Sequence, residues 1–292
     1  MAQGPRIDSA MTGVPALLGP LPSGPPRRET VTVGDATLAV EVLGTGRPVV
    51  FAHGLGGSLA SWWPQLPVVA AAGYQAIAFS HRGFYPSSSV SLPDPLGYAE
   101  DLLAIVDQLG LDPIVLVCQS MGGWTGVEFA LRYPDRLRGL VLSATTGTFD
   151  PAQMNLPGLS AWQERAASLA NAWREAGIHP ACGERMAREQ PALHHLYVEL
   201  DAATLTLDKQ ALRERLFATR TRPPVDAAGI RCPVLTVSGT EDCVIPTSAV
   251  MALAGYVPNG RAVSIPTTGH SPYIERPSLF NAVLLDFLGT LA

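Results

Sequence analysis

Short apolar runs alternate with segments of helical periodicity along the chain from residue 49 to residue 143. The runs are rich in β-branched residues and end at Gly-containing or polar turns, which is typical of buried strands. Between them, apolar residues recur every three or four positions, which predicts amphipathic helices. This alternation predicts βαβ units, and therefore a mostly parallel sheet with helices on both faces. The predicted strands are 49–52, 75–79, 113–117 and 137–143, and the predicted helices are 58–72, 98–109 and 124–133.

The pattern extends the sheet at both ends of the chain. Before residue 49, two short runs with Gly34-Asp35 between them predict a β-hairpin. Near the C-terminus, two further apolar runs predict strands, and a helix follows each of them. We therefore expect an α/β fold. The added strands are 31–33, 37–43, 233–238 and 261–265, and the added helices are 247–255 and 277–288.

Between residues 148 and 224 the strands stop. This stretch predicts helices with no clear strand between them, at 159–176, 183–189, 191–203 and 207–218. An all-helical insert after the sixth sheet strand is typical of a cap over a site. We therefore predict an α/β core at 29–147 and 225–292, a helical cap at 148–224, and a flexible N-terminal arm at 1–28, which is rich in Pro, Gly and Ala.

Composition narrows the classes of partner. The chain has 292 residues, of which 47% are apolar and 15% charged, so it can bury a large core. The formal charge of −5 gives no electrostatic reason to expect a nucleic acid or a membrane as partner. No run of about 18 apolar residues would span a bilayer, and 11–21 makes a poor signal peptide, so we expect a cytoplasmic protein.

Cysteine and histidine spacing argues against a metal site. The four cysteines show no C-x-x-C pattern, and we expect them to be reduced. His194-His195 is not accompanied by the spacing of a metal site. We expect no metal and no cofactor, and a small molecule as the partner, while a homo-oligomer is left open.

Ser120 lies between a predicted strand and a predicted helix, in a strand–turn–helix that favours a nucleophile elbow, usually spelled G-x-S-x-G. Gly122 supplies the small residue on the helix side, whereas Cys118 replaces the first Gly. The turn would lift the hydroxyl above the sheet, where the amide of Met121 is free to donate to an oxyanion. The alternative is a serine that only caps a helix. The run is Cys118-Gln119-Ser120-Met121-Gly122-Gly123.

A second Gly-rich turn follows the strand 49–52. In His53-Gly54-Leu55-Gly56-Gly57, the amide of Leu55 is well placed to be the second oxyanion donor. An ordinary strand-to-helix turn is the alternative.

Asp242 and His270 are the candidates to activate Ser120. A serine hydroxyl needs a base within hydrogen-bond reach and a third group that fixes the base. Both residues follow predicted parallel strands, and the order Ser, Asp, His is the one expected after a nucleophile elbow. Taken singly, an Asp after a strand is often a helix cap, and Glu241 is a reserve candidate. Ser120, Asp242, His270 and the turn His53 to Gly57 all follow predicted strands, and their joint occurrence favours the catalytic interpretation.

From about residue 30 to residue 292 the chain resembles the α/β-hydrolase superfamily. The resemblance implies the α/β-hydrolase fold, Ser120 as nucleophile, His270 as base, Asp242 as its orienting acid, and the amides of Leu55 and Met121 as the oxyanion hole. The motifs that carry it are His53 to Gly57, His81-Arg-Gly83, Gln119 to Gly123, Arg132-Tyr-Pro-Asp-Arg136, Gly239-x-x-Asp242 and Gly269-His-Ser-Pro-Tyr-Ile-Glu-Arg-Pro277.

Three positions depart from the pattern of that family. They are Cys118 in the elbow, Ser80 where many members carry Asp, and Tyr85 where they usually carry Gly. The ring of Tyr85 would narrow or line the mouth of the pocket. The candidate substrate-binding residues are Gly54, Gly56, Tyr85 and Gln119.

The expected activity is that of a serine hydrolase that cleaves an ester or lactone of a small, largely apolar molecule through an acyl-enzyme on Ser120. The Ser-Met-Gly-Gly run and the cap also resemble carbon–carbon bond hydrolases of vinylogous diketo acids. Those generally carry an aromatic residue after the catalytic His, where this chain has Ser271, and its C-terminal motif looks more like small esterases and enol-lactonases. A lyase, oxygenase, perhydrolase or ligand sensor of the same fold is the remaining alternative.

Overall fold

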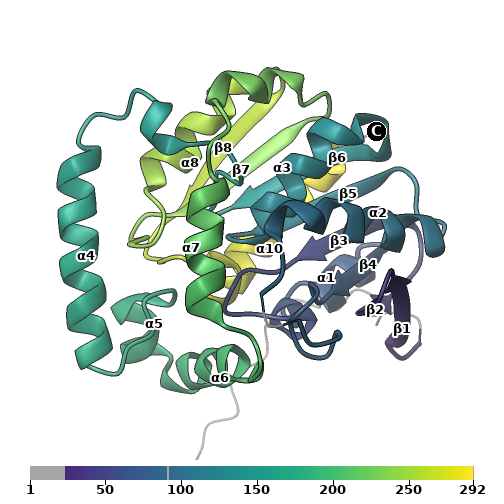
Figure 1. The fold of residues 1–292 in the computed structure, drawn as a ribbon, viewed down its shortest axis with the longest axis horizontal. Coiled ribbons are helices and arrows are strands. Elements are labelled where there is room, and N and C mark those ends of the chain that lie inside the picture. Colours follow the sequence, from purple (N-terminus) through teal and green to yellow (C-terminus); the bar gives the residue numbers. More distant parts are fainter. Residues whose placement is uncertain (1–23, 91, 292) are drawn as a thin grey trace, which may run out of the picture.

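The computed structural model describes residues 24–90 and 92–291, and its centre is an eight-stranded sheet in the order β1-β2-β4-β3-β5-β6-β7-β8 (Figure 1). The strands from β4 to β8 in this order pair in parallel, whereas β1, β2 and β4 pair antiparallel. The predicted hairpin and parallel sheet are confirmed. The strands are β1 (Arg27–Val33), β2 (Ala36–Leu43), β3 (Arg47–Ala52), β4 (Tyr74–Phe79), β5 (Ile114–Gln119), β6 (Leu137–Ser143), β7 (Val234–Gly239) and β8 (Gly260–Ile265).

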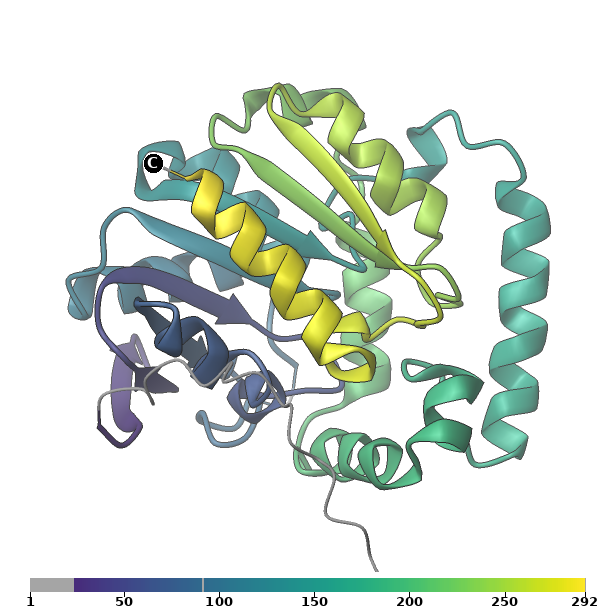
Figure 2. The same ribbon diagram turned by 180° about the vertical axis from the view of Figure 1, so that it is seen from behind.

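Helices cover both faces of this sheet, as predicted. The face toward the viewer in Figure 1 carries α2 (Tyr98–Gln108), α3 (Gly122–Arg132) and α8 (Thr247–Leu253). The other face, seen in Figure 2, carries α1 (Leu66–Ala71) and α10 (Pro277–Thr290), with the short α9 (Pro272–Glu275) before it. The central strands are therefore buried on both sides, which explains their continuous apolar sequences.

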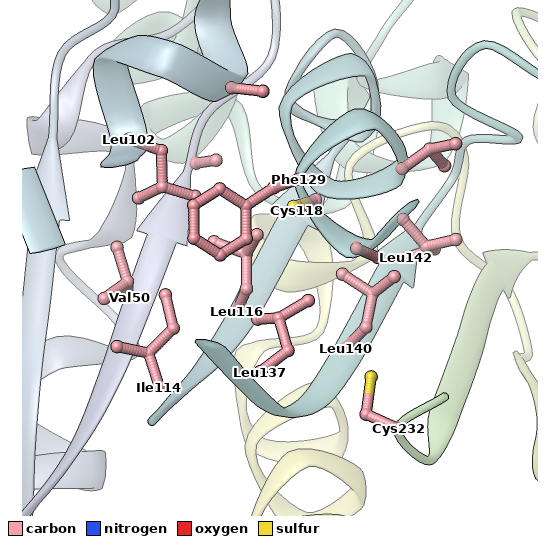
Figure 3. Close-up of a cluster of buried hydrophobic side chains, with 14 of the residues drawn as sticks. Val50, Leu102, Ile114, Leu116, Cys118, Phe129, Leu137, Leu140, Leu142 and Cys232 are labelled. Carbon is pink, nitrogen blue, oxygen red and sulfur yellow. The ribbon is translucent and has the colours of Figure 1, made fainter. Parts of the chain in front are cut away.

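The two faces pack two separate hydrophobic clusters. Figure 3 shows the first, in which Leu102 of α2 and Phe129 of α3 pack on Val50, Leu116 and Leu140 of the sheet. All five side chains are fully buried. Burial of a side chain of this size contributes about 1.5–3 kcal/mol each, so the cluster holds α3, and the turn that precedes it, firmly on the sheet.

Four helices separate β6 from β7, and we call residues 159–219 the helical insertion. Figure 1 shows α4 standing apart from the sheet and α7 lying between it and the core. Their bounds match the expected helices to within two residues at each end: α4 (Leu159–Glu175), α5 (Gly183–Glu189), α6 (Pro191–Ala202) and α7 (Lys209–Thr219). The insertion follows the sixth strand, as expected.

Two expectations need correction. The helix expected over 58–72 is broken into a 3₁₀ turn, Leu59–Trp62, and α1. Pro64 lies at the break, where it has no amide hydrogen to donate to a helical carbonyl. The N-terminal arm is also shorter than expected, because Arg27 and Arg28 already pair with Val42 and Glu41 in β1. Residues 1–23 of the predicted arm lie outside the described residues.

Candidate active site

Ser120 occupies a sharp turn between β5 and α3. Its φ is 48°, in the left-handed region that a non-glycine residue rarely adopts, and its amide donates to the carbonyl of Ser143. Gly122 permits the turn, because a Cβ there would lie 2.3 Å from the carbonyl oxygen of Ala52. The strand, turn and helix are thus present as predicted, and the backbone at Ser120 is held in an uncommon conformation by its surroundings.

Cys118, the departure from the usual elbow sequence, is accommodated by a glycine in the next helix. Its side chain is fully buried in the cluster of Figure 3. A Cβ at Gly126 of α3 would lie only 2.6 Å from Cys118 Sγ. The side chain of Cys118 therefore fits beneath α3 because Gly126 has no side chain.

His270 bridges Ser120 and Asp242. Its Nε2 lies 2.9 Å from Ser120 Oγ, and its Nδ1 lies 2.9 Å from Asp242 Oδ2. A carboxylate only accepts hydrogen bonds, so Nδ1 carries the proton and Nε2 is free to accept from the Ser120 hydroxyl. The structure thus brings together the three residues predicted from distant parts of the sequence.

Asp242 is held in place by the loop that follows it. Its Oδ1 accepts hydrogen bonds from the amides of Val244 and Ile245, at 2.7 and 3.0 Å. It does not cap α8, which has Pro246 at its N-cap position. The reserve candidate Glu241 instead pairs with Arg185 of the insertion, at 3.0 Å.

The loop that carries His270 is fixed on both sides by one buried carboxylate. Glu275 accepts from the amide of Gly269 at 2.8 Å and from the amide of Ser271 at 3.0 Å. Gln119 adds a third contact, since its Nε2 donates to the carbonyl of His270 at 3.1 Å. Burial raises the pKa of Glu275 to about 8, against the opposing effect of its two amide donors. Sequence reasoning missed Glu275; its only signal was its place in the motif after His270.

Leu55 and Met121 line the same cavity as Ser120 and His270. Within the described chain, neither of their amides donates a hydrogen bond to a backbone carbonyl. Two free donors beside a nucleophile could stabilise the oxyanion that forms when a carbonyl is attacked.

Two buried histidines support the loop that carries Leu55. His53 Nδ1 donates to the carbonyl of Gly54 at 2.8 Å, and its Nε2 accepts from the amide of His81 at 3.0 Å. Burial lowers the pKa of His53 to about 4 and holds that of His81 well below its usual value. Both rings are therefore neutral at pH 7, and they tie the loop after β3 to the loop after β4.

The cavity has a volume of about 800 Å³ and is shared between the core and the helical insertion. Of the four candidate substrate-binding residues, Gly56 and Gln119 line it. Gly54 does not line it but packs against Gln119, since a Cβ at position 54 would lie 2.0 Å from Gln119 Oε1. Tyr85 is 65% exposed and does not line the cavity, and its amide donates to Thr204 Oγ1 of the helical insertion at 3.2 Å, so its place at the pocket mouth stays a prediction.

Metal-ligand clusters and membrane-spanning helices are absent from the described residues. Within the described ranges no group of acidic, cysteine or histidine side chains could hold a metal ion, and all four cysteines are free. In the same ranges, every helix is too short or too polar to cross a membrane.

Comparison with known proteins adds a family match. A family model described as alpha/beta hydrolase fold matches residues 47–277. A relative from Mycobacterium tuberculosis (strain ATCC 25618 / H37Rv), named "Putative non-heme bromoperoxidase BpoC", is 30% identical over 275 residues, which cover 87% of this chain and 98% of that protein.

Solved structures of esterases and lactonases share the architecture. A thermophilic esterase from Thermogutta terrifontis matches with a TM-score of 0.71 at 26% identity, over 92% of this chain and 99% of that one. The enol-lactonase from Burkholderia xenovorans LB400 matches with a TM-score of 0.70 at 23% identity, over 89% and 100%, which supports the fold alone.

Proposed function

Because the chain belongs to the alpha/beta hydrolase fold family and is a hydrolase, we propose that it cleaves a carboxylic ester or lactone of a small molecule through an acyl-enzyme on Ser120. The observation that carries this proposal is the hydrogen-bonded series Ser120–His270–Asp242, which ends in a cavity that Leu55 and Met121 also line. Nucleophile, base, orienting acid and oxyanion donors are the parts that acyl transfer to a serine requires.

Each part has one role in the proposed reaction. Ser120 Oγ attacks the substrate carbonyl while His270 Nε2 takes the hydroxyl proton, and the oxyanion accepts from the amides of Leu55 and Met121. The ester C–O bond breaks as His270 returns the proton to the leaving alcohol oxygen. Water then attacks the acyl-enzyme with the same assistance, which releases the acid and restores Ser120. Asp242 stabilises the imidazolium in both halves of the cycle.

We propose that the helical insertion is a cap that limits substrate size. Residues of α4, α6 and α7 form much of the wall of the cavity that Ser120 also lines. A cavity of about 800 Å³ holds a small molecule and excludes polymers. Long-chain triacylglycerol and intact protein should therefore be poor substrates.

A substrate panel tests the proposed function. It contains 4-nitrophenyl acetate and butyrate, a γ-lactone, an enol-lactone, a vinylogous diketo acid and a triacylglycerol emulsion, each with wild type and Ser120→Ala. We expect turnover of at least one small ester or lactone, and loss of several orders of magnitude in kcat/KM in Ser120→Ala with unchanged circular dichroism. Equal turnover by the two proteins would refute the role of Ser120, and preference for the emulsion would refute the cap.

A further inference from the structure

Arg220 stands out on the cavity wall because it is a half-buried cation that has no ion-pair or hydrogen-bond partner among the described residues. It follows the last residue of α7, and its guanidinium lies 4.8 Å from the centroid of the Trp124 ring and 5.3 Å from that of Phe217. Its Nε is buried and has no hydrogen-bond partner among the described residues. Stacking on aromatic rings leaves the edge of a guanidinium free to donate.

No carboxylate of the described chain neutralises this group. Asp150 is the only acid that influences it, and the carboxylate of Asp150 already accepts from the amide of Ala152 and from Gln153 Nε2. Burial lowers the pKa of Arg220 to about 10, so the side chain remains a cation at pH 7. Buried cations are usually paired, because losing water without gaining a partner is costly.

The cavity as a whole is basic, although the chain is acidic with a formal charge of −5. Its wall contains four Arg or Lys side chains and a single carboxylate, that of Asp201. Asp201 is already engaged by Lys209, at 2.8 Å, and by His179, at 3.6 Å. The remaining cations are Arg174, Arg213 and Arg220. A basic cavity attracts an anionic ligand, even in a protein whose net charge is negative.

Arg220 is also held at a fixed place relative to the nucleophile. Trp124 lies in the first turn of α3, about one helical turn after Ser120. Its Nε1 donates to Thr219 Oγ1 at 3.0 Å, which joins the end of α7 to α3. The ring on which Arg220 stacks is therefore part of the element that positions Ser120, and all three residues line the one cavity.

We propose that Arg220 binds a carboxylate of the substrate, so that the substrate is an ester or lactone with a free carboxylate at the end remote from the scissile carbonyl. A single planar guanidinium packed against two aromatic rings matches a planar carboxylate, with which it can form two parallel hydrogen bonds. Trp124, Leu216 and Phe217 leave apolar room for the carbon chain between the two ends. This inference rests on the proposed function, and it replaces the expectation of a largely apolar substrate.

The test compares esters that differ only in charge. One pair is 4-nitrophenyl hydrogen glutarate and 4-nitrophenyl 5-methylhexanoate, and the other is 4-nitrophenyl hydrogen adipate and 4-nitrophenyl 6-methylheptanoate. In each pair an isopropyl group replaces the carboxylate. We expect the wild type to prefer the carboxylate in at least one pair by about 10- to 100-fold in kcat/KM, the range for a hydrogen bond between charged groups.

Three variants assign the preference to Arg220. Arg220→Gln should lose this preference, because its kcat/KM should fall more for the carboxylate esters than for their neutral partners. Unchanged circular dichroism shows that the variant is folded. Arg220→Lys, which keeps the charge without the planar fork, should retain part of the preference. Arg231→Gln removes the same charge from an exposed pair with Asp135 and should behave as wild type.

The outcomes separate this inference from the proposed function. Ser120-dependent hydrolysis with no preference for the carboxylate in either pair would overturn the role of Arg220 and leave the serine hydrolase standing. An equal preference in wild type and Arg220→Gln would also overturn it. Failure of the wild type to hydrolyse any ester would overturn the proposed function itself.

Discussion

Glu275 shows how one side chain sets the geometry of another at the residue scale. Its two carboxylate oxygens accept from the amides on either side of His270, so the backbone of that loop has little freedom. The group achieves this while buried beside Asp242, whose negative charge also raises the pKa of Glu275. Because the pKa of Glu275 is higher in the folded protein than in the unfolded chain, the group that holds His270 in place also makes the free energy of unfolding depend on pH.

The sign of this dependence follows from linkage. The pKa of Glu275 is about 8 in the folded protein and 4.5 for a free glutamate. Between these values the unfolded chain has lost the proton that the folded protein keeps, so the free energy of unfolding falls as pH rises. Glu275→Gln removes this contribution. The free energy of unfolding, measured in urea at pH 5, 6, 7 and 8, should therefore fall more steeply with pH in wild type than in Glu275→Gln. The difference should reach a few kcal/mol over the whole range.

A matched variant checks that the effect belongs to Glu275. Glu241→Gln changes a carboxylate in the neighbouring loop whose partner, Arg185, is at the surface. Its unfolding free energy should follow that of wild type across the same pH values. If the Glu275→Gln curve also runs parallel to that of wild type, Glu275 does not titrate as the structure indicates.

At the scale of elements, β5 and α3 are fitted to each other through Cys118 and Gly126. Figure 3 shows Cys118 beneath α3, within the cluster of buried side chains. A glycine inside a helix costs about 1 kcal/mol relative to alanine, so its presence at 126 needs a reason. The reason is the close approach of the strand, because a Cβ would meet Cys118 Sγ at 2.6 Å and Leu140 Cδ1 at 3.1 Å.

This fit predicts coupling between the two positions. Gly126→Ala should lower the free energy of unfolding by about 1–3 kcal/mol, because overpacking outweighs the gain in helix propensity. In the background of Cys118→Gly the same change should cost less, or should stabilise. A double-mutant cycle by chemical denaturation measures the difference. An identical cost of Gly126→Ala in both backgrounds would contradict the packing described here.

For the whole molecule, local pattern predicted most of the fold. The strands were predictable because buried parallel strands are continuous apolar runs, and α5 begins and ends at the expected residues. The prediction failed at 58–72, where apolar periodicity continued across Pro64 although the helix does not. The elbow and the residues His270 and Asp242 were predictable because each lies in a short motif at a strand end.

Other parts of the site could not be predicted, because they depend on contacts between distant segments. Arg220 is an ordinary basic residue in the sequence, and its lack of a partner emerges only when α7 packs on Trp124 of α3. The contrast between an acidic molecule and a basic cavity is likewise a property of the folded chain.

The most direct test of the account is to trap the acyl group on Ser120. Wild type is mixed with excess 4-nitrophenyl acetate, quenched in acid within the first turnovers, digested and analysed by mass spectrometry, with Ser120→Ala as control. We predict a burst of about one 4-nitrophenolate per enzyme and an acetyl group on Ser120, with neither in Ser120→Ala. Turnover by wild type with Ser120 left unmodified, or an unchanged burst in Ser120→Ala, would contradict the central claim.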